Sequence, residues 1–162
     1  MGDSEYNRQE LETLGFPKTA VFPIAVNTAR LTEAPPRPAL ERVLRDGLTN
    51  ILFVGRIAPN KKLEDHLRLA EHYKRYVDAF HRFIFVGRED ACPRYYAMLR
   101  ALMTRYGMTS ERFWFVGPVP DADLAVFYRT ASAYVSLSEH EGFCVPLLEA
   151  MATGVPVLAY AS

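Results

Sequence analysis

The chain has 162 residues, of which 49% are hydrophobic and 23% charged, an ordinary composition for a soluble domain with a sizeable core. Its 19 Lys and Arg balance its 19 Asp and Glu. This zero net charge argues against general binding of nucleic acid, which usually requires a basic excess. No apolar run approaches a membrane span, and the first ten residues hold no apolar signal core. The two cysteines match no metal or redox spacing, so we expect free thiols in a cytoplasmic protein.

The first fifty residues do not resemble a domain in themselves. Ser4 can cap a short helix that runs to about Leu14. Residues 20–26, "AVFPIAV", indicate a strand, and Pro23 within them favours an edge or a bend. Residues 34–38, "APPRP", are typical of a semi-rigid linker.

Five short apolar runs follow in the remainder of the chain. They begin at Ile51, Phe83, Trp114, Ala133 and Val155. Continuous apolar runs of this length suit strands that are covered on both faces, as in a parallel sheet. Between them, the apolar spacing predicts helices over 62–80, 93–106 and 121–130, with Asp121 as a cap, and a last one from Pro146 towards Gly154. This alternation predicts a Rossmann-like, doubly wound α/β domain.

Ligands of open α/β sheets bind at the carboxyl ends of the strands. At that edge, Arg56 follows one predicted strand and Lys61 stands five residues later, where a helix begins. The two cations could hold a diphosphate, Arg as a fork and Lys as a point charge. Taken alone, however, basic loop residues are more often simply solvated. The loop is not a Walker loop, because Gly-Lys-Ser/Thr is absent. No Gly-x-Gly-x-x-Gly follows any predicted strand, which argues against a nicotinamide or flavin dinucleotide site.

The stretch "EGFCVPLLEA", residues 141–150, leads from a strand end into a helix. Free N–H groups at Cys144 and Val145 would point into the cleft with the positive helix end behind them. Glu149, one turn inside, suits the hydroxyls of a ribose, and Glu141 those of a second sugar. The simpler alternative is that Glu141 ends a loop and Glu149 lies on a solvated face. Cys144 lacks a placed base, so a small-residue role is favoured over that of a nucleophile.

The chain resembles the retaining glycosyltransferases of the GT-B fold, glycosyltransferase family 4, over nearly its whole length. "FVGRIAPNKK" matches the family's Gly-Arg-x4-Lys element, and "EGFCVPLLEAMATGVPVLA" matches its Glu-x7-Glu signature and tail. "FVGPVPDADLAVFYRTASAYVSLS" matches the segment between them. The order and spacing of all three are more specific than any one of them. The family often has glycine where this chain has Lys62 and Cys144.

The resemblance implies a role for each matching residue. Arg56 and Lys61 would hold the donor diphosphate as it leaves, Glu149 would bind the ribose, and Glu141 would contact the transferred sugar. The base would lie near the loops after Gly87 and Gly117. The implied donor-binding residues are Gly55, Arg56, Lys61, Gly117, Glu141, Gly142, Phe143, Cys144, Val145 and Glu149. The implied catalytic residues are Arg56, Lys61 and Glu141.

The resemblance also implies a division of the chain and a reaction. Residues 1–50 would be the tail of an N-terminal acceptor domain and the linker, and residues 51–162 a nucleotide-sugar-binding domain that lacks its last elements. The enzyme would be a hexosyltransferase without metal or cofactor, and this chain alone would be inactive. Its partners would be a nucleotide-sugar and a glycan, lipid or small-molecule acceptor. The N-terminal domain could associate peripherally with a membrane. Nucleic acid would not be a partner.

Two other functions remain open at this stage. The chain could be a non-catalytic nucleotide-sugar-binding or assembly module, because half of a cleft can keep its donor contacts without transferring anything. It could also belong to another GT-B enzyme, such as a nucleotide-sugar epimerase, because fold analogy alone does not fix a reaction.

Overall fold

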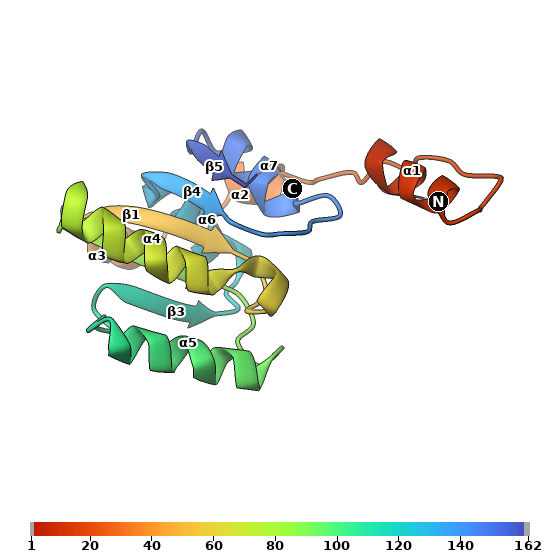
Figure 1. Ribbon diagram of the computed structural model, residues 1–162. Coiled ribbons are helices and arrows are strands. Elements are labelled where there is room, and N and C mark those ends of the chain that lie inside the picture. The colour runs from red at the N-terminus through yellow and green to blue at the C-terminus, as the bar shows by residue number, and fades with distance from the viewer. Residues whose placement is uncertain (1, 161–162) are drawn as a thin grey trace.

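The computed structural model describes residues 2–160 and has a parallel sheet at its centre (Figure 1). The helices are α1 (Glu5–Thr13), α2 (Ala29–Thr32), α3 (Pro38–Leu44), α4 (Leu63–Tyr76), α5 (Pro93–Arg105), α6 (Asp121–Thr130) and α7 (Val145–Ala152), with a 3-10 turn η1 at Pro59–Lys61. The strands are β1 (Thr49–Val54), β2 (His81–Val86), β3 (Phe113–Gly117), β4 (Ala133–Ser136) and β5 (Val157–Ala159). All five predicted strands and the four helices between them are present, so the predicted α/β class is confirmed.

The strands are all parallel and lie in the order β3-β2-β1-β4-β5. From β1 the chain moves outward to β2 and β3, and then returns to the other side of β1 for β4 and β5. The strand order therefore reverses between β1 and β4. In open α/β sheets, the crevice at such a reversal is where ligands bind.

Both faces of the sheet are covered, because successive side chains of a strand point to opposite faces. Ile51 and Phe53 of β1 belong to the core that includes α4 and α5, whereas Leu52 belongs to the core that includes α6. Figure 1 shows α4 and α5 in front of the sheet and α6 behind it. This double cover explains why the strands read as continuous apolar runs.

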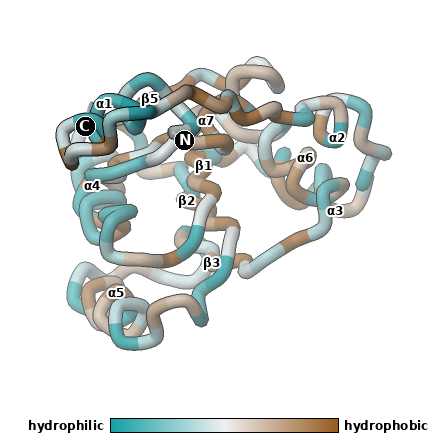
Figure 2. Tube along the Cα trace, turned by 90° about the vertical axis from the view of Figure 1, so that its right-hand side faces the viewer, coloured by the Kyte–Doolittle hydropathy of each residue, from teal (hydrophilic) through white to brown (hydrophobic). Residues whose placement is uncertain are grey.

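Two short helices ahead of the sheet, α2 and α3, pack against α6, and the three lie side by side in Figure 2. Leu31 of α2 and Leu44 of α3 are fully buried in the same core as Phe127 of α6. The sequence pattern did not predict these helices, because neither is long enough to display an amphipathic period. Segment 29–44 therefore shares its core with the sheet.

The N-terminal segment differs in part from its prediction. Helix α1 is present, and the Ser4 hydroxyl accepts the N–H of Asn7 at 3.2 Å, as expected of a cap. The strand predicted over 20–26 is wrong, because only an isolated bridge between Gly2 and Val21 forms there. Pro23 offers no N–H, and within residues 2–160 none of the five sheet strands pairs with this segment.

The predicted cap of α6 is also wrong. Pro120 occupies the capping position, and Asp121 is the first helical residue, with no capping bond from its side chain. Its carboxylate instead forms an ion pair with Arg30 of α2. A long-range partner has thus replaced the local one that the sequence suggested.

The amino edge of the sheet holds a buried arginine. Arg82 at the start of β2 is 2% exposed, and its Nε and Nη2 donate to Oδ1 of Asn50 at 3.0 and 2.8 Å. Its Nη2 also reaches Asp46 at 3.1 Å, and its guanidinium lies 4.2 Å from the centre of the Trp114 ring. Asn50 in turn donates to the carbonyls of Leu44 and Thr130 at 2.8 and 3.2 Å. This cluster joins three strands to the ends of α3 and α6.

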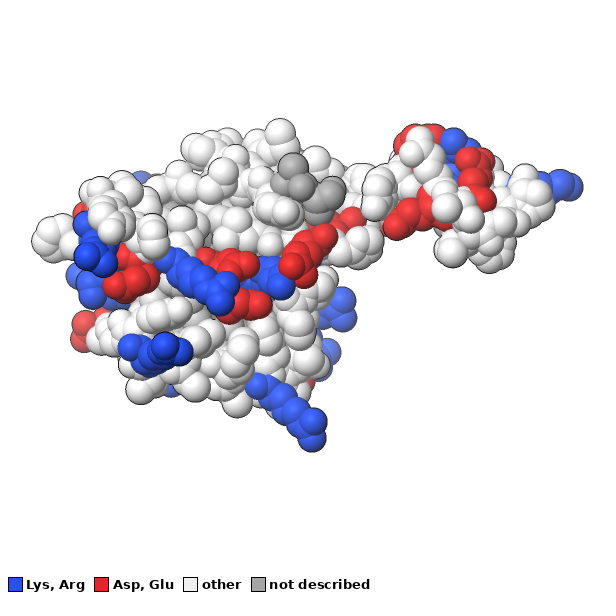
Figure 3. All heavy atoms as spheres, viewed as in Figure 1, with Lys and Arg blue, Asp and Glu red and all other residues white. Residues whose placement is uncertain are grey.

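Charge is mixed on one face of the molecule. On the face shown in Figure 3, lysines and arginines alternate with acidic residues along the region of α4 and do not form a continuous basic area. Among the helices of residues 2–160, none combines the length and the apolar character that crossing a bilayer would need.

Candidate functional site

The point where the strand order reverses carries the predicted site. The loop after β1 runs from Gly55 through η1 to Lys62, and the loop after β4 runs from Leu137 to Cys144. Because β1 and β4 are parallel neighbours, their carboxyl ends deliver both loops to the same edge. The two basic residues and the first glutamate predicted from the sequence stand on these two loops.

Lys61 and Glu141 meet across the crevice. Nζ of Lys61 lies 2.6 Å from Oε1 of Glu141, and the two side chains are 14% and 24% exposed. Two further contacts join the same loops: the N–H of Glu139 donates to the carbonyl of Asn60 at 3.0 Å, and Lys62 pairs with Glu139 at 2.7 Å. The sequence predicted both partners of the central pair, but not that they bind each other.

Two residues of these loops have a backbone conformation that favours glycine. Lys62 has φ of 50° and Cys144 has φ of 52°, and each precedes the first residue of a helix, α4 or α7. A side chain in this left-handed region costs about 1–2 kcal/mol. The family that the sequence resembles often has glycine at these two positions. Lys62 and Cys144 therefore adopt a backbone conformation typical of glycine although each has a side chain.

The start of α7 offers unpaired donors. Within residues 2–160, the N–H groups of Phe143 and Cys144 donate to no backbone or side-chain acceptor. Val145 is the first helical residue, and Pro146 has no N–H. Such groups at the positive end of a helix bind anions or sugar hydroxyls. They lie directly after Glu141, so they border the crevice.

Cys144 is poorly suited to be a nucleophile. Burial and the nearby Glu141 carboxylate raise the pKa of its thiol, which keeps the thiol protonated near neutral pH. The raised pKa agrees with the small-residue role favoured from the sequence.

The surroundings of Arg56 differ from those of the glycines at the strand ends and in the crevice loop. Arg56 is exposed, and within residues 2–160 its side chain has no hydrogen bond or ion pair. A Cβ on Gly87 would lie 2.1 Å from the carbonyl oxygen of Gly55, so these two strand ends can pack together only without a side chain at Gly87. Gly117 has φ of 75° in open space, which a glycine adopts without strain. Gly142 is exposed and lies beside Asp3 of the N-terminal segment.

Glu149 lies in a second cluster rather than in the crevice pair. Its side chain is 3% exposed, Oε1 is bound by Nη2 of Arg30, and Oε2 accepts the hydroxyl of Tyr128 at 2.8 Å. Burial, followed by the Glu149 charge, raises the pKa of the Tyr128 hydroxyl, which therefore remains a donor. Arg30 also binds Asp121 and is 33% exposed. The solvated helix face considered from the sequence is wrong for this residue.

A buried histidine fixes the start of α4 beneath the site. His66 is fully buried, with Nδ1 3.1 Å from the carbonyl of Lys62 and Nε2 3.2 Å from that of Val135 in β4. A neutral imidazole has one N–H, so it donates to one of these oxygens at a time. Burial lowers the pKa of His66 from its ordinary value of 6.5. The ring links the residue after Lys61 to the strand before Glu141.

We expect the stability of the protein to fall as His66 is protonated. Its folded-state pKa is below its unfolded value, so its contribution is complete above about pH 6.5 and is lost as the pH falls through the folded pKa. The free energy of unfolding should drop between pH 7 and 5 by up to about 1.4 kcal/mol per pH unit. Urea titrations at several pH values should show a shallower slope for His66→Gln. The exposed His72→Gln should keep the wild-type slope, and an equal slope in both variants would contradict the role of His66.

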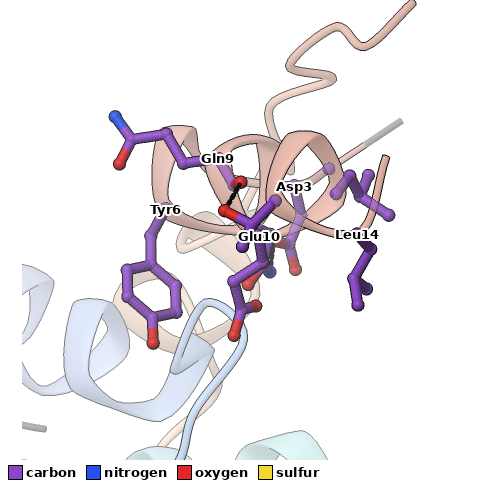
Figure 4. A pocket seen from close by; sticks show the side chains of 9 residues that line it. Asp3, Tyr6, Gln9, Glu10 and Leu14 are labelled. Atoms are coloured by element: carbon purple, nitrogen blue, oxygen red, sulfur yellow. Dashed lines mark hydrogen bonds between the residues drawn. The ribbon is translucent and has the colours of Figure 1, made fainter. Parts of the chain in front are cut away.

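Two hollows lie near the N-terminal segment. One, of about 380 Å³, is lined by Ser4 and Tyr6 together with residues 139–144, and so opens onto the crevice loop. A larger one, of about 790 Å³, lies along α1, where Asp3, Tyr6, Gln9, Glu10 and Leu14 surround it (Figure 4). The larger hollow contains none of the predicted site residues, so size alone does not locate the site. Among residues 2–160, no three His, Cys, Asp or Glu side chains gather as a metal site would need.

Sequence reasoning missed the partners of Glu149. Arg30 is 119 residues away along the chain, on a helix of four residues that has no periodic signal. Tyr128 appears in the sequence only as one apolar position of α6. Its hydroxyl could have been suspected, because a buried Tyr usually finds a hydrogen-bond partner.

Comparison with known proteins identifies the family. The sequence profile described as "Glycosyl transferases group 1" matches residues 41–162, which include both crevice loops and Glu149. The chain belongs to the group 1 glycosyltransferases. The resemblance to glycosyltransferases that the sequence motifs indicated is confirmed at the level of this family.

Two mycobacterial mannosyltransferases are among the similar proteins. The GDP-mannose-dependent alpha-mannosyltransferase of Mycobacterium tuberculosis (strain CDC 1551 / Oshkosh) is 28% identical over 160 residues, which cover 98% of this chain and 38% of that protein. The phosphatidyl-myo-inositol mannosyltransferase of Mycobacterium leprae (strain TN) is 31% identical over 154 residues, covering 94% and 37%. The chain therefore spans less than two fifths of the length of these relatives.

A solved structure supports the fold. Anabaena HepE in complex with UDP-glucose superposes with a TM-score of 0.81 at 19% identity, covering 98% of this chain and 43% of that one. At this identity the likeness establishes the architecture alone, a Rossmann-like half of the GT-B fold, as predicted from the sequence.

Proposed function

We propose that the chain is the donor-binding part of a retaining hexosyltransferase of glycosyltransferase family 4. The enzyme moves a sugar from a nucleoside-diphosphate-sugar to an acceptor hydroxyl, without metal or other cofactor. The observation that carries this proposal is the pair formed by Lys61 and Glu141 at the strand-order reversal, beside the unpaired N–H groups of Phe143 and Cys144. The names of the relatives favour GDP-mannose as the donor, whereas HepE was solved with UDP-glucose. The two free cysteines suit a cytoplasmic enzyme.

In this mechanism the cations act on the leaving group. As the bond between sugar and diphosphate breaks, negative charge grows on the phosphate, and Lys61 and Arg56 stabilise it. Glu141, held by Lys61, accepts the hydroxyls of the transferred sugar and so positions it. A diphosphate oxygen takes the proton of the acceptor hydroxyl on the same face of the sugar. The N–H groups at the start of α7 bind sugar or phosphate oxygens.

The two glutamates should respond differently to removal. Glu149→Ala should weaken binding of the nucleoside diphosphate by about 1–3 kcal/mol, because it removes a charged acceptor of the ribose hydroxyls. Glu141→Ala should weaken the intact nucleotide-sugar more than the nucleoside diphosphate, because its partner is the sugar. Calorimetry with GDP-mannose and GDP, and with UDP-glucose and UDP, measures both. Equal losses for both ligands in both variants would refute this division of roles.

A further inference from the structure

Glu149 has no free side towards solvent in the absence of a nucleotide. Its side chain is 3% exposed, and each carboxylate oxygen already has a donor, Arg30 on Oε1 and Tyr128 on Oε2. The two oxygens keep further lone pairs, but a side chain that is only 3% exposed leaves a ribose no open approach to them, so a ribose gains access by replacing one of the two donors. The question is which of them can leave.

Tyr128 is fixed in its place. It is fully buried within α6, and its hydroxyl also reaches the carbonyl of Pro146 at 3.2 Å. Moving it would open a void in the core between α6 and α7, which costs several kcal/mol for an aromatic residue. The bond from Tyr128 to Oε2 therefore stays when a ligand arrives.

Arg30 has the opposite properties. Its side chain is 33% exposed, and it belongs to a four-residue helix whose backbone is anchored by the buried Leu31. Its second nitrogen, Nη1, binds Asp121, which is 55% exposed. The guanidinium can therefore release Oε1 of Glu149 and still keep a carboxylate partner, so its charge is never left unpaired.

The chemistry of the two occupants is alike. A guanidinium presents N–H donors to a carboxylate, and a ribose presents O–H donors to the same oxygen lone pairs. We infer that Arg30 occupies the ribose position on Glu149 when no nucleotide is bound, and that Asp121 holds Arg30 when a ribose takes its place. The inference rests on the proposed ribose role of Glu149 and adds to it a residue that sets how much the ribose contributes to affinity.

Arg30 thus stabilises the carboxylate of Glu149 when no nucleotide is bound. A buried carboxylate without a cationic or hydrogen-bonding partner is costly, and Arg30 removes that cost until the ligand arrives. The net contribution of the ribose to the binding free energy is therefore the energy of its own contacts with Glu149 less the energy of the contact that Arg30 loses. Arg30 is therefore a competitor of the ribose and at the same time a stabiliser of the free protein.

The test compares a nucleoside diphosphate with its 2′,3′-dideoxy analogue, which lacks both ribose hydroxyls. GDP or UDP is used, whichever binds more tightly, at pH 8, and the ratio of the two dissociation constants measures the ribose preference. Arg30→Met should raise this preference about tenfold, because a charge-assisted hydrogen bond of at least about 1.4 kcal/mol no longer competes. The same variant should lower the unfolding temperature of the free protein. A ribose preference that is unchanged or lower would overturn the inference, because it would make Arg30 a support for the ribose or a structural residue alone.

Asp121→Asn provides a second test, on a residue whose side chain is 55% exposed. Without this anchor, Arg30 depends on Glu149 alone, so the ribose preference should fall severalfold. An unchanged preference would again overturn the inference. Arg30→Lys should lie between Arg30→Met and wild type, because lysine keeps the charge but cannot fork to both carboxylates.

A neighbouring ion pair provides matched controls, between Asp123, two residues after Asp121 on α6, and Arg37, which directly precedes α3. Arg37 pairs with Asp123 at 3.0 Å in a partly exposed contact of the same kind that does not involve Glu149. Arg37→Met and Asp123→Asn should leave the ribose preference unchanged. Glu149→Gln distinguishes the ribose role of Glu149 from the competing role of Arg30. If this variant keeps the wild-type ribose preference, the ribose role of Glu149 is wrong. If it abolishes the preference while Arg30→Met has no effect, the inference about Arg30 alone fails.

Discussion

Replacing Lys61 with methionine should lower the rate of sugar transfer by about 100-fold or more in the complete protein. Removing one donor that stabilises developing charge typically costs this much. Lys61 is largely buried and sits against Glu141, so its charge acts in a site partly shielded from water, where electrostatic contacts are stronger. The loss should appear mainly in kcat, because the phosphate charge is greater in the transition state than in the bound donor. Steady-state kinetics with a nucleotide-sugar and its acceptor measure both constants.

The neighbouring lysine gives a matched control. Lys62 carries the same charge one residue later, but its ammonium pairs with the exposed Glu139. Lys62→Met should change kcat by less than about fivefold, as expected for an exposed ion pair. Arg56→Ala should behave like Lys61→Met, though more weakly, because Arg56 is exposed. If Lys61→Met raises only the Michaelis constant and leaves turnover intact, the leaving-group role of Lys61 is wrong.

Local sequence patterns predicted the sheet and the crevice because both depend on short stretches of chain. A buried parallel strand needs a continuous apolar run, and the sequence "FVG" marks where the runs of β1, β2 and β3 reach the ligand edge. Lys61 and Glu141 were predicted separately, each from its position after a strand. Their meeting at 2.6 Å follows from the pairing of β1 with β4, which the strand pattern alone does not specify.

The contacts that escaped prediction join residues far apart in the sequence. Arg30 reaches Glu149 and Asp121 from a helix too short to be recognised. Asp121 pairs with Arg30 and does not cap α6, as its position in the sequence suggested it would. The strand predicted over 20–26 failed for the complementary reason. An apolar run becomes a strand only when a neighbour supplies hydrogen bonds, and among residues 2–160 the single bridge from Gly2 to Val21 is all that this run receives.

The amino edge of the sheet should prove the most sensitive part of the fold. Asn50→Leu removes the amide that accepts two bonds from the buried Arg82 and donates to the carbonyls of Leu44 and Thr130. We expect it to lower the free energy of unfolding by about 2–4 kcal/mol, because Nε of the buried Arg82 loses its acceptor and two carbonyl groups lose a donor, although Asp46 still pairs with the guanidinium. Urea titration with an unchanged slope would measure this as a shift in midpoint.

A second substitution shows whether the guanidinium that lost its Asn50 acceptor is the cause. Arg82→Met in the Asn50→Leu background removes that charge and fills the space with an apolar chain of similar length. The double variant should be more stable than the sum of the two single losses predicts, by about 1–3 kcal/mol. Arg88→Met breaks an exposed arginine pair with Asp90 and should change stability by about 0.5 kcal/mol or less. Simple additivity of Asn50→Leu and Arg82→Met would show that the loss comes from packing and not from the buried charge.

The cluster of Asn50 and Arg82 lies away from the crevice, so a change there should affect stability without affecting nucleotide binding. Asn50 and Arg82 lie at the starts of β1 and β2, and the crevice lies at the opposite ends of the same parallel strands. The folded fraction of Asn50→Leu should therefore bind a nucleoside diphosphate with the wild-type dissociation constant, although less of the protein is folded. Ligand then restores stability by mass action, and the midpoint should rise with nucleotide concentration by the same increment as in wild type. A smaller increment would mean that the loss at the amino edge reaches the loops that hold Lys61 and Glu141, through the strands that connect them.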